Sequence, residues 1–419
     1  MNSRTKSLTE SNAISWKPLS QKGYSVGFFH SIKEFKDSWD QSAPKHNIFL
    51  QSTYLEILEN NPPAGMSFCY LLFRKDEEML GVAACQIQYF NIEKSLNIKE
   101  NEASPCFFNT LGRYLKGLVA SKAEFTTLIC GNLLLTGEHG YYFNPKVVNS
   151  KLAFELVNEG MDHGREQLEG TEKRVSGFLI KEFFEETRNE GDFQKTTCNE
   201  FTVQPNMILE INPSWKTFED YTAAMSSKYR VRTKRAFKKA ADLEKRSFDE
   251  AMIIEYKQRI FDLYQMVAEN SGFNLINLNL DYLPALKRAF KDDFTLDGYF
   301  LDGVLVAFYT TITNGHETEA HFLGMDPKPN REYQVYMNIL YDIIRKGIDR
   351  QSKYIVFART ATEIKSSVGA VPHEMYCYMR HPNNFANKFM TPILDYLKPE
   401  EDWVQRNPFK DAAAAQRAS

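Results

Sequence analysis

The chain has 419 residues, which exceeds what one hydrophobic core usually organises, so we expect two domains of roughly 200 residues. Apolar residues make up 43% and charged residues 25%, both ordinary for a folded protein, and the net charge of −3 indicates no class of partner. No apolar run approaches the roughly 20 residues of a membrane-spanning helix, and the N-terminal residues lack the apolar core of a signal peptide. We therefore expect a cytoplasmic protein that at most lies against the inner face of a membrane.

Motif searches exclude several classes of enzyme. The sequence contains no GxxxxGK[ST], no GxGxxG after a strand, no GxSxG and no HExxH. The signature motifs of NTPases, dinucleotide-binding enzymes, α/β-hydrolases and zincins are therefore absent. Six cysteines are widely spread without a CxxC pair, which argues against zinc and against a disulfide framework. We predict no metal site and no permanently bound cofactor.

The first half of the chain alternates helical and strand patterns. STYLEILEN (52–60) predicts a helix, and residues 67–90 read as strand, charged turn and strand. Residues 144–168 carry apolar side chains at helical spacing and predict a second helix. These elements indicate a sheet covered by helices.

The second half repeats this layout. We predict a long helix over 215–245 and another over 250–268, followed by a three-stranded meander over 294–326. Its turns are marked by Asp302-Gly303 and Asn314-Gly315, two strong hairpin signals. A helix over 330–349 and the short strand KYIVF follow.

The repeated layout predicts duplication of one α/β unit, with mixed sheets and helices on both faces, unlike a Rossmann fold or a barrel. We place the domain boundary near residue 200. The predicted organisation is a poorly ordered N-terminus (1–22), an N-terminal lobe (23–200), a C-terminal lobe (201–397) and a C-terminal tail (398–419).

The densest charge signal is SSKYRVRTKRAFKKA, which has seven cations and no anion. On a helix, Lys228, Arg232 and Arg235 share one face. Such a face is either simply solvated or binds a phosphate-bearing partner: a pantetheine carrier, CoA, tRNA or a phospholipid surface. Because like charges at helical spacing repel one another, we favour the phosphate-bearing partner.

A second signal lies in HETEAHFLGMD, where Glu317, Glu319 and His321 alternate along a predicted strand and so point to one face. Their spacing of roughly 7 Å at Cα would let two of them act on one bound group. We expect His321, oriented or polarised by Glu319, or else Glu319 itself, to accept a proton from an attacking amine. The alternative is an edge strand with ordinary polar residues.

The third signal is FARTATEIKSSVGAVP, where an aliphatic run ends at Arg359. Thr360 and Glu363 have the spacing of a capping box, and Gly369 is expected to end the short helix. Arg359 and Lys365 remain as candidate anion-binding residues at the end of a core strand.

Three motifs of the second half occur together: the basic helix start SSKYRVRTKRAFKK, the segment LDGVLVAFY running into HFLGMDP, and a helix followed by FARTATEIKSSVGA. Together they resemble the Fem-type and Fem-like GNAT-fold acyltransferases associated with peptidoglycan biosynthesis and recognition. The resemblance covers roughly residues 205–395. It implies two GNAT-like lobes in tandem, each with a mixed, mostly antiparallel sheet, and transfer of an acyl or aminoacyl group to an amine.

The candidate residues follow from the signals and from this resemblance. The expected catalytic residues are His321, Glu319, Arg359 and Lys365. The expected substrate-binding or cofactor-binding residues are Lys228, Tyr229, Arg230, Arg232, Arg235, Tyr309 and Glu363.

The sequence departs from the family pattern in three ways. Ala358 stands where the pattern often has glycine, no Gly-rich pyrophosphate loop is present, and the long helical arm of tRNA-dependent members is missing. The second departure makes the basic helix the expected phosphate anchor.

We therefore expect an N-acyltransferase that moves an acyl group from acyl-CoA or an acyl carrier protein to a primary amine. The acceptor would be a long-chain amine of sphingoid type or an amino acid. Aminoacyl-tRNA is a less favoured donor, and no DNA partner is expected. The alternatives are Fem-type aminoacyl transfer to a peptidoglycan precursor and a non-catalytic GNAT-like binding module.

Overall fold

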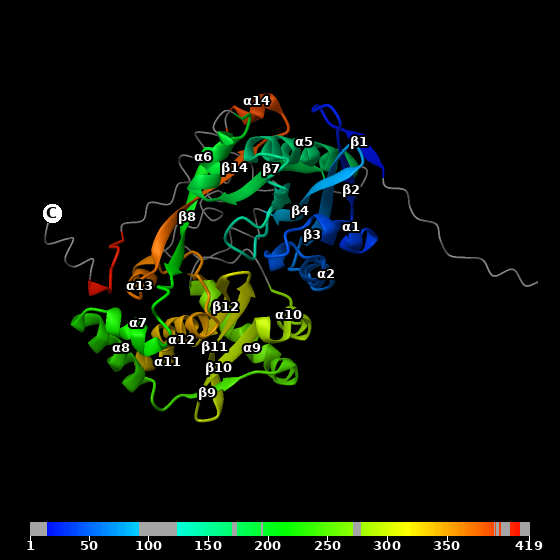
Figure 1. Cartoon of the computed structure of the whole chain (residues 1–419). Coiled ribbons are helices and arrows are strands. Elements are labelled where there is room, and N and C mark those ends of the chain that lie inside the picture. The colour runs from blue at the N-terminus through cyan, green and yellow to red at the C-terminus, as the bar shows by residue number, and fades with distance from the viewer. Residues whose placement is uncertain are drawn as a thin grey trace, which may run out of the picture.

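The computed structural model describes residues 15–91, 124–169, 174–193, 196–270, 278–388, 390, 394 and 403–410. One large sheet runs through both halves of the chain, with β1–β4 (strands within 16–91) and β7 (Val175–Phe183) above and β9–β12 (strands within 244–325) below in Figure 1. Helices pack on the faces of each half. None of the helices in these ranges combines the length and the apolarity that a bilayer span requires.

The N-terminal half consists of strands with two larger helices. Its strands are β1 (Trp16–Pro18), β2 (Tyr24–Phe29), β3 (Met66–Lys75), β4 (Glu78–Asn91), β5 (Glu124–Cys130), β6 (Tyr141–Phe143) and β7 (Val175–Phe183). Its helices are α1 (Lys36–Ser42), α2 (Ser52–Asn60), α5 (Ser150–Leu168) and α6 (Glu185–Gly191). The predicted helix over 52–60 is confirmed to the residue.

The C-terminal half contains the predicted meander. Its strands are β8 (Asn199–Glu210), β9 (Glu244–Ser247), β10 (Phe294–Leu301), β11 (Val304–Asn314), β12 (Glu317–Met325), β13 (Tyr354–Val356) and β14 (Val371–Arg380). Its helices are α7 (Phe218–Ala224), α8 (Ser227–Lys239), α9 (Glu250–Asn270), α10 (Tyr282–Phe290), α11 (Pro327–Tyr333), α12 (Val335–Asp349), α13 (Thr362–Ser366) and α14 (Asn384–Asn387). Sequence reasoning missed β8, β9 and α10.

The two halves of the sheet are built alike. The strand order is β1-β2-β3-β4-β5-β7-β14-β8-β13-β12-β11-β10-β9, with β6 beside β4. In each half an antiparallel meander leads through a helical crossover to one parallel pair, β5 with β7 and β12 with β13. The other pairings in the described residues are antiparallel. The predicted mixed, mostly antiparallel architecture is confirmed.

The last strand joins the halves. β14 lies between β7 of the N-terminal half and β8 of the C-terminal half and pairs with both. The sheet therefore crosses the proposed boundary near residue 200 without a break.

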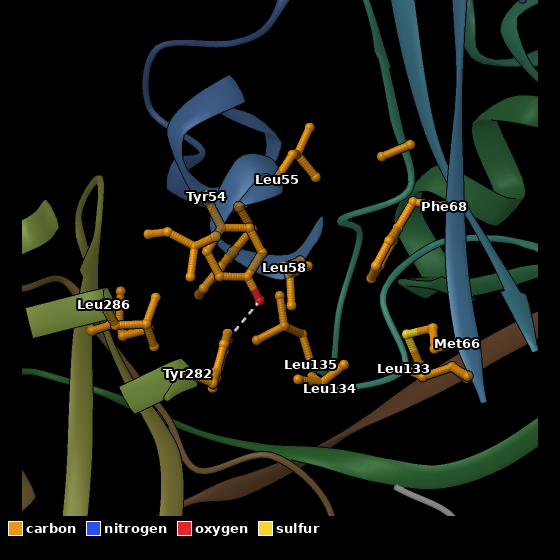
Figure 2. Close-up of a cluster of buried hydrophobic side chains, with 14 of the residues drawn as sticks. Tyr54, Leu55, Leu58, Met66, Phe68, Leu133, Leu134, Leu135, Tyr282 and Leu286 are labelled. Carbon is orange, nitrogen blue, oxygen red and sulfur yellow. Dashed lines mark hydrogen bonds between the residues drawn. The ribbon is translucent and has the colours of Figure 1, made fainter. Parts of the chain in front are cut away.

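The halves also share one apolar core. Figure 2 shows Tyr54 of α2 reaching toward Tyr282 of α10, and both belong to one buried cluster with Leu55, Leu58 and Leu286. Apolar burial of this kind is the main stabilising term in folding. The halves are therefore held together by a continuous hydrophobic core as well as by the sheet.

The predicted long helix over 215–245 is wrong, because it is two helices. The backbone is extended at Met225 and Ser226, between α7 and α8. There Met225 forms a β-bridge with Phe409, and the N–H of Ser226 donates to the carbonyl of Pro408 at 2.8 Å. A contact with the far end of the chain thus replaces one helical turn.

The predicted helix over 330–349 is also two helices, here separated by a single residue. Gln334 has a left-handed backbone with φ of 53° and separates α11 from α12. The side chain of Asn330 accepts a hydrogen bond from the N–H of Tyr336 at 2.9 Å, which caps the start of the second helix.

The segments expected to be poorly ordered are partly described. Trp16–Pro18 forms β1 and pairs with β2. Phe409 packs against Trp215 and Tyr221, with ring centroids 5.4 and 6.0 Å apart. Residues 1–14 and 411–419 lie outside the described residues.

Candidate active site

The candidate site begins where two neighbouring strands separate. β12 and β13 pair through only three residues each, and the last pair is Glu319 with Val356. Beyond it β12 continues to Met325, whereas β13 ends. A cavity lies between them, lined by residues 320–323 on one side and 357–361 on the other.

The cavity is large and mostly apolar. Its volume of about 700 Å³ lies within the range of small-molecule sites. The N-terminal half contributes the loop 133–136, and the C-terminal half contributes apolar side chains such as Phe322, Leu340 and Ile343. The cavity is also lined by three candidate residues from the sequence: His321, Arg359 and Lys365.

A β-bulge on β12 brings consecutive residues to this cavity. The register of β11 and β12 shifts between Tyr309 and Thr311, so that Thr310 stands opposite both His321 and Phe322. The hydroxyl of Thr310 accepts from the N–H of Phe322 at 2.7 Å and donates to its carbonyl at 3.0 Å. Residues 320–323 therefore all line the cavity, which strict alternation along a strand would not allow.

Arg359 is held by a carboxylate from the other half of the chain. Its Nη1 lies 2.8 Å from Oε1 of Glu182, which is 0% exposed, and Nζ of Lys181 lies 3.0 Å from the same oxygen. The N–H of Gly137 donates to Oε2 of Glu182 at 2.7 Å. Burial opposes ionisation of Glu182, yet Arg359 and Lys181 together hold its pKa below the usual value.

Lys365 is buried at the same end of the cavity. Only 5% of the residue is exposed, and Nζ donates to the carbonyls of Ala358 and Arg359 at 3.2 and 2.5 Å. Burial, with a smaller contribution from the charge of Arg359, lowers the pKa of Lys365 to about 7. A neutral amine has two N–H groups, so two carbonyl partners leave its lone pair available to accept a proton.

The backbone beside these groups is strained. Ala358, Thr360 and Ala361 have φ of 58°, 68° and 48°, in the left-handed region that costs non-glycine residues roughly 1–2 kcal/mol each. Such strain clusters at functional sites. Ala358, at the position where the family pattern often has glycine, thus adopts a backbone conformation that glycine would take without this cost.

His321 makes its hydrogen bond away from Arg359 and Lys365. Its Nε2 lies 3.0 Å from the hydroxyl of Tyr282 on α10. Burial lowers the pKa of His321 to about 3, so the imidazole is neutral at physiological pH.

Comparison with known proteins gives likenesses at the level of structure alone. No protein-family model matches the sequence, and no curated protein matches it. The chain is similar to FemX at 11% identity, over 83% of this chain and 96% of that one, with a TM-score of 0.49. It is similar to a tandem GNAT protein from the clavulanic acid biosynthesis pathway at 8% identity (85% and 99% covered, TM-score 0.45). A third similar structure is L-PGS from Bacillus licheniformis, at 9% identity (81% and 94% covered, TM-score 0.41).

The sequence motifs led us to expect two similar lobes in tandem. The two halves of the sheet are equivalent in this way, since each has one parallel strand pair.

Glu319, predicted beside His321, lies behind the cavity wall. It is 5% exposed, accepts a hydrogen bond from Nδ2 of Asn314 at 2.7 Å, and is not among the residues that line the cavity. Burial, with the charge of Glu317, raises the pKa of Glu319 to about 8. Any influence on a ligand would therefore pass through its neighbours. Tyr309, the predicted binding residue on β11, lines the cavity.

The raised pKa of Glu319 predicts a pH-dependent stability. The folded state keeps this proton between about pH 4.3, the ordinary pKa of glutamate, and about pH 8, so its contribution to stability is lost as the pH rises through that window. We expect Glu319→Gln, which cannot ionise, to raise the free energy of unfolding at pH 9 by about 5 kcal/mol, at 1.36 kcal/mol for each pKa unit between about 4.3 and about 8. At pH 4 the variant and the wild type should unfold at the same urea concentration. Equal stability at both pH values would contradict a buried, protonated Glu319.

The predicted capping box at Thr360 and Glu363 is wrong. The N-cap of α13 is Ala361, and no side chain caps it. Glu363 instead forms an ion pair with Arg406, with Nη2 and Oε1 2.5 Å apart. The left-handed backbone before α13 turns Thr360 out of the capping geometry, and Gly369, with φ of 100°, ends the turn after the helix.

The basic helix does not reach the cavity. On α8, Lys228, Arg232 and Arg235 are exposed, whereas Tyr229 is buried against α12 and its neighbours in the C-terminal core. The side chain of Arg230 donates to the carbonyl of Met225. None of these five residues lines the cavity. A cation that does line it is Arg331 of α11, a helix that contacts α8.

Replacing Lys228, Arg232 and Arg235 together by glutamine tests whether α8 binds a phosphate-bearing donor. We expect KM for such a donor to rise several-fold and to depend less on salt, because surface electrostatic attraction is screened by ions. The matched control replaces Lys234, Lys238 and Lys239, three other exposed cations of α8. Equal KM values in both variants and the wild type would mean that the cations of α8 are only solvated and do not bind the donor.

Sequence reasoning missed the contributions of the N-terminal half. The loop 133–136 lines the cavity, and Glu182 forms ion pairs with Lys181 and with the cavity residue Arg359. The fold brings these residues to the site, and no local sequence pattern predicts it. It also missed that Cys69, Cys85 and Cys130 stand side by side on β3, β4 and β5. They are buried in the apolar core, and the described residues contain no group of three His, Cys, Asp or Glu side chains placed to hold a metal ion.

Proposed function

We propose that this protein is an N-acyltransferase that works in the cavity between β12 and β13. The observation that carries the proposal is the combination of mostly apolar walls with a buried polar end. Apolar walls suit an acyl or alkyl chain, and the polar end suits the carbonyl and the amine that react.

The donor would be a thioester, either acyl-CoA or an acyl carrier protein. The amine nitrogen attacks the thioester carbonyl, a C–N bond forms, the C–S bond breaks, and the thiol leaves with a proton. Holding both reactants in one cavity supplies much of the acceleration. Arg331 lies at the cavity on the side of α8 and would attract the phosphate groups of the donor.

Lys365 would accept the proton of the attacking amine. It was first expected to hold an anion, but a buried amine with a pKa of about 7 is neutral in about half of the molecules at neutral pH. A general base with a pKa near the working pH is the efficient choice. Arg359, fixed by Glu182, would stabilise negative charge on the donor or acceptor.

The acceptor would be a primary amine with an apolar body, such as a long-chain amino lipid, or an amino acid. The loop 133–136 adds three leucines to the wall, which favours an apolar acceptor over a peptidoglycan precursor. A long-chain acceptor would bring the protein to the inner face of a membrane.

The test is a matrix of donors and acceptors analysed by mass spectrometry. Purified protein is incubated with acyl-CoA and acyl carrier protein donors of several lengths, each with sphingoid-type bases, amino acids and a peptidoglycan precursor. We expect an N-acylated product with an apolar amine. Product from an aminoacyl-tRNA and the precursor alone would replace this proposal by the Fem-type reaction. No transfer with any pair would leave the binding-module hypothesis.

A further inference from the structure

A line of buried hydrogen bonds connects His321 to the N-terminal half. Nε2 of His321 lies 3.0 Å from the hydroxyl of Tyr282, which lies 3.0 Å from the hydroxyl of Tyr54. Nδ2 of Asn132 donates to Tyr54 at 3.1 Å. Both tyrosines are fully buried, and Figure 2 shows their hydroxyl groups meeting between α2 and α10.

Asn132, at the far end of this line, determines which group donates in each hydrogen bond. The backbone N–H of Leu134 can only donate, and it donates to Oδ1 of Asn132 at 2.9 Å. Nε2 of Gln86 donates to the same oxygen at 3.1 Å, and Oε1 of Gln86 is held by the N–H of Leu133 at 2.8 Å. Asn132 therefore cannot be flipped, and its amide nitrogen faces Tyr54.

The direction passes from residue to residue. Since Tyr54 accepts from Asn132, its own O–H is free to donate to Tyr282, and Tyr282 in turn donates to Nε2 of His321. The reverse direction would leave the O–H of Tyr54 without an acceptor in a fully buried site, which is unfavourable. A neutral histidine that accepts at Nε2 carries its proton on Nδ1.

Nδ1 is then the group that His321 offers to a ligand. The imidazole is partly exposed and lines the cavity. Among the described residues, the side-chain hydrogen bond of His321 is the one from Tyr282 to Nε2. The proton on Nδ1 makes this atom a hydrogen-bond donor and not a base.

We propose that Tyr54 and Tyr282 are positioning residues that hold His321 as the Nδ1–H tautomer, so that Nδ1–H donates to the carbonyl oxygen of the acyl donor. This role rests on the proposed acyl transfer. It replaces the expectation that His321 takes the proton from the amine, because Nε2 is occupied by Tyr282. As the amine attacks, negative charge develops on that oxygen, and a fixed donor stabilises it.

The tautomer is tested without any substrate. In protein labelled with [15N]histidine, long-range 1H–15N correlation spectra distinguish the two tautomers, and His321→Gln assigns the signal among the eight histidines. We expect the Nδ1–H form from pH 5 to pH 8, and a mixture or the Nε2–H form in Tyr282→Phe. Tyr341→Phe is the matched control. It removes a buried hydroxyl that accepts a hydrogen bond from Thr233 in the C-terminal core, apart from Tyr54, Tyr282 and His321. An Nε2–H form in the wild type would overturn the proposal.

The catalytic use of the tautomer is tested by kinetics. Asparagine can place its amide N–H near the position of Nδ1, whereas glutamine places it near Nε2. We expect His321→Gln to lower kcat by about 10²-fold, as loss of one such donor does, and His321→Asn to retain more activity. Tyr282→Phe should lower kcat with little change in KM, and Tyr341→Phe should change neither.

The two readouts separate the possible failures. Nδ1–H in the spectra together with unchanged kcat in Tyr282→Phe would overturn the positioning role. Equal losses in His321→Asn and His321→Gln would overturn the donor role of Nδ1. Absence of acyl transfer with every substrate would overturn the proposed function and the catalytic role with it, while the spectra would still decide the tautomer.

Discussion

Replacing Glu182 by alanine is expected to lower the free energy of unfolding by about 3–5 kcal/mol, because it leaves the buried Lys181 and the partly buried Arg359 without their carboxylate. Glu182 is 0% exposed and lies within 3.0 Å of both Lys181 and Arg359. Urea denaturation at pH 7 measures the effect. The matched control is Glu155→Ala, which removes an exposed carboxylate from α5 and should change stability by less than about 0.5 kcal/mol.

The loss should depend on pH in a defined direction. The pKa of Glu182 is lowered in the folded state, so its contribution is present above the ordinary glutamate pKa of about 4.3 and is lost as the pH falls through the folded value. The difference between wild type and Glu182→Ala should therefore shrink below about pH 4. A difference under about 1 kcal/mol at pH 7 would contradict a buried ion-pair cluster between the two halves.

Replacing Lys365 by methionine is expected to lower turnover by about 10²–10⁴-fold, the usual range for loss of a general base. Methionine keeps much of the buried volume, so the fold should persist. Because the pKa of Lys365 is lowered to about 7, wild-type kcat/KM should rise with pH to a plateau above that value, and this limb should vanish in the variant.

Initial rates of N-acyl product across pH 5.5–9 give this profile. Lys353→Met is the control, since Lys353 is exposed at the start of β13 and does not line the cavity. Wild-type turnover in Lys365→Met would show that the lysine is not the general base and is only a buried structural group.

Local signals in the sequence were sufficient where the structure is local. The helix over 52–60 was predicted to the residue, and the meander turns at Asp302-Gly303 and near Gly315, where both glycines have positive φ. His321, Arg359 and Lys365, which the sequence singled out as candidates, all line one cavity.

Long-range contacts account for what the sequence did not reveal. The expected long helix breaks at Met225 because residues 408–409 pair with its backbone. The capping box fails because Glu363 pairs with Arg406 and the backbone of Thr360 and Ala361 is left-handed. Glu182 and Tyr54 reach the site through contacts between the halves, which no spacing rule along the chain encodes.

The most direct test of acyl transfer between β12 and β13 is to fill the cavity. Ala320 lies on its wall, and Ala320→Trp would occupy space that the substrates need, whereas Ala223→Trp adds the same side chain to an exposed site on α7. Both variants are compared with wild type by mass spectrometry of the N-acylated product, after thermal unfolding confirms that they are folded. We predict at least a tenfold loss of product with Ala320→Trp and wild-type rates with Ala223→Trp. Equal rates in all three proteins would contradict a reaction in this cavity.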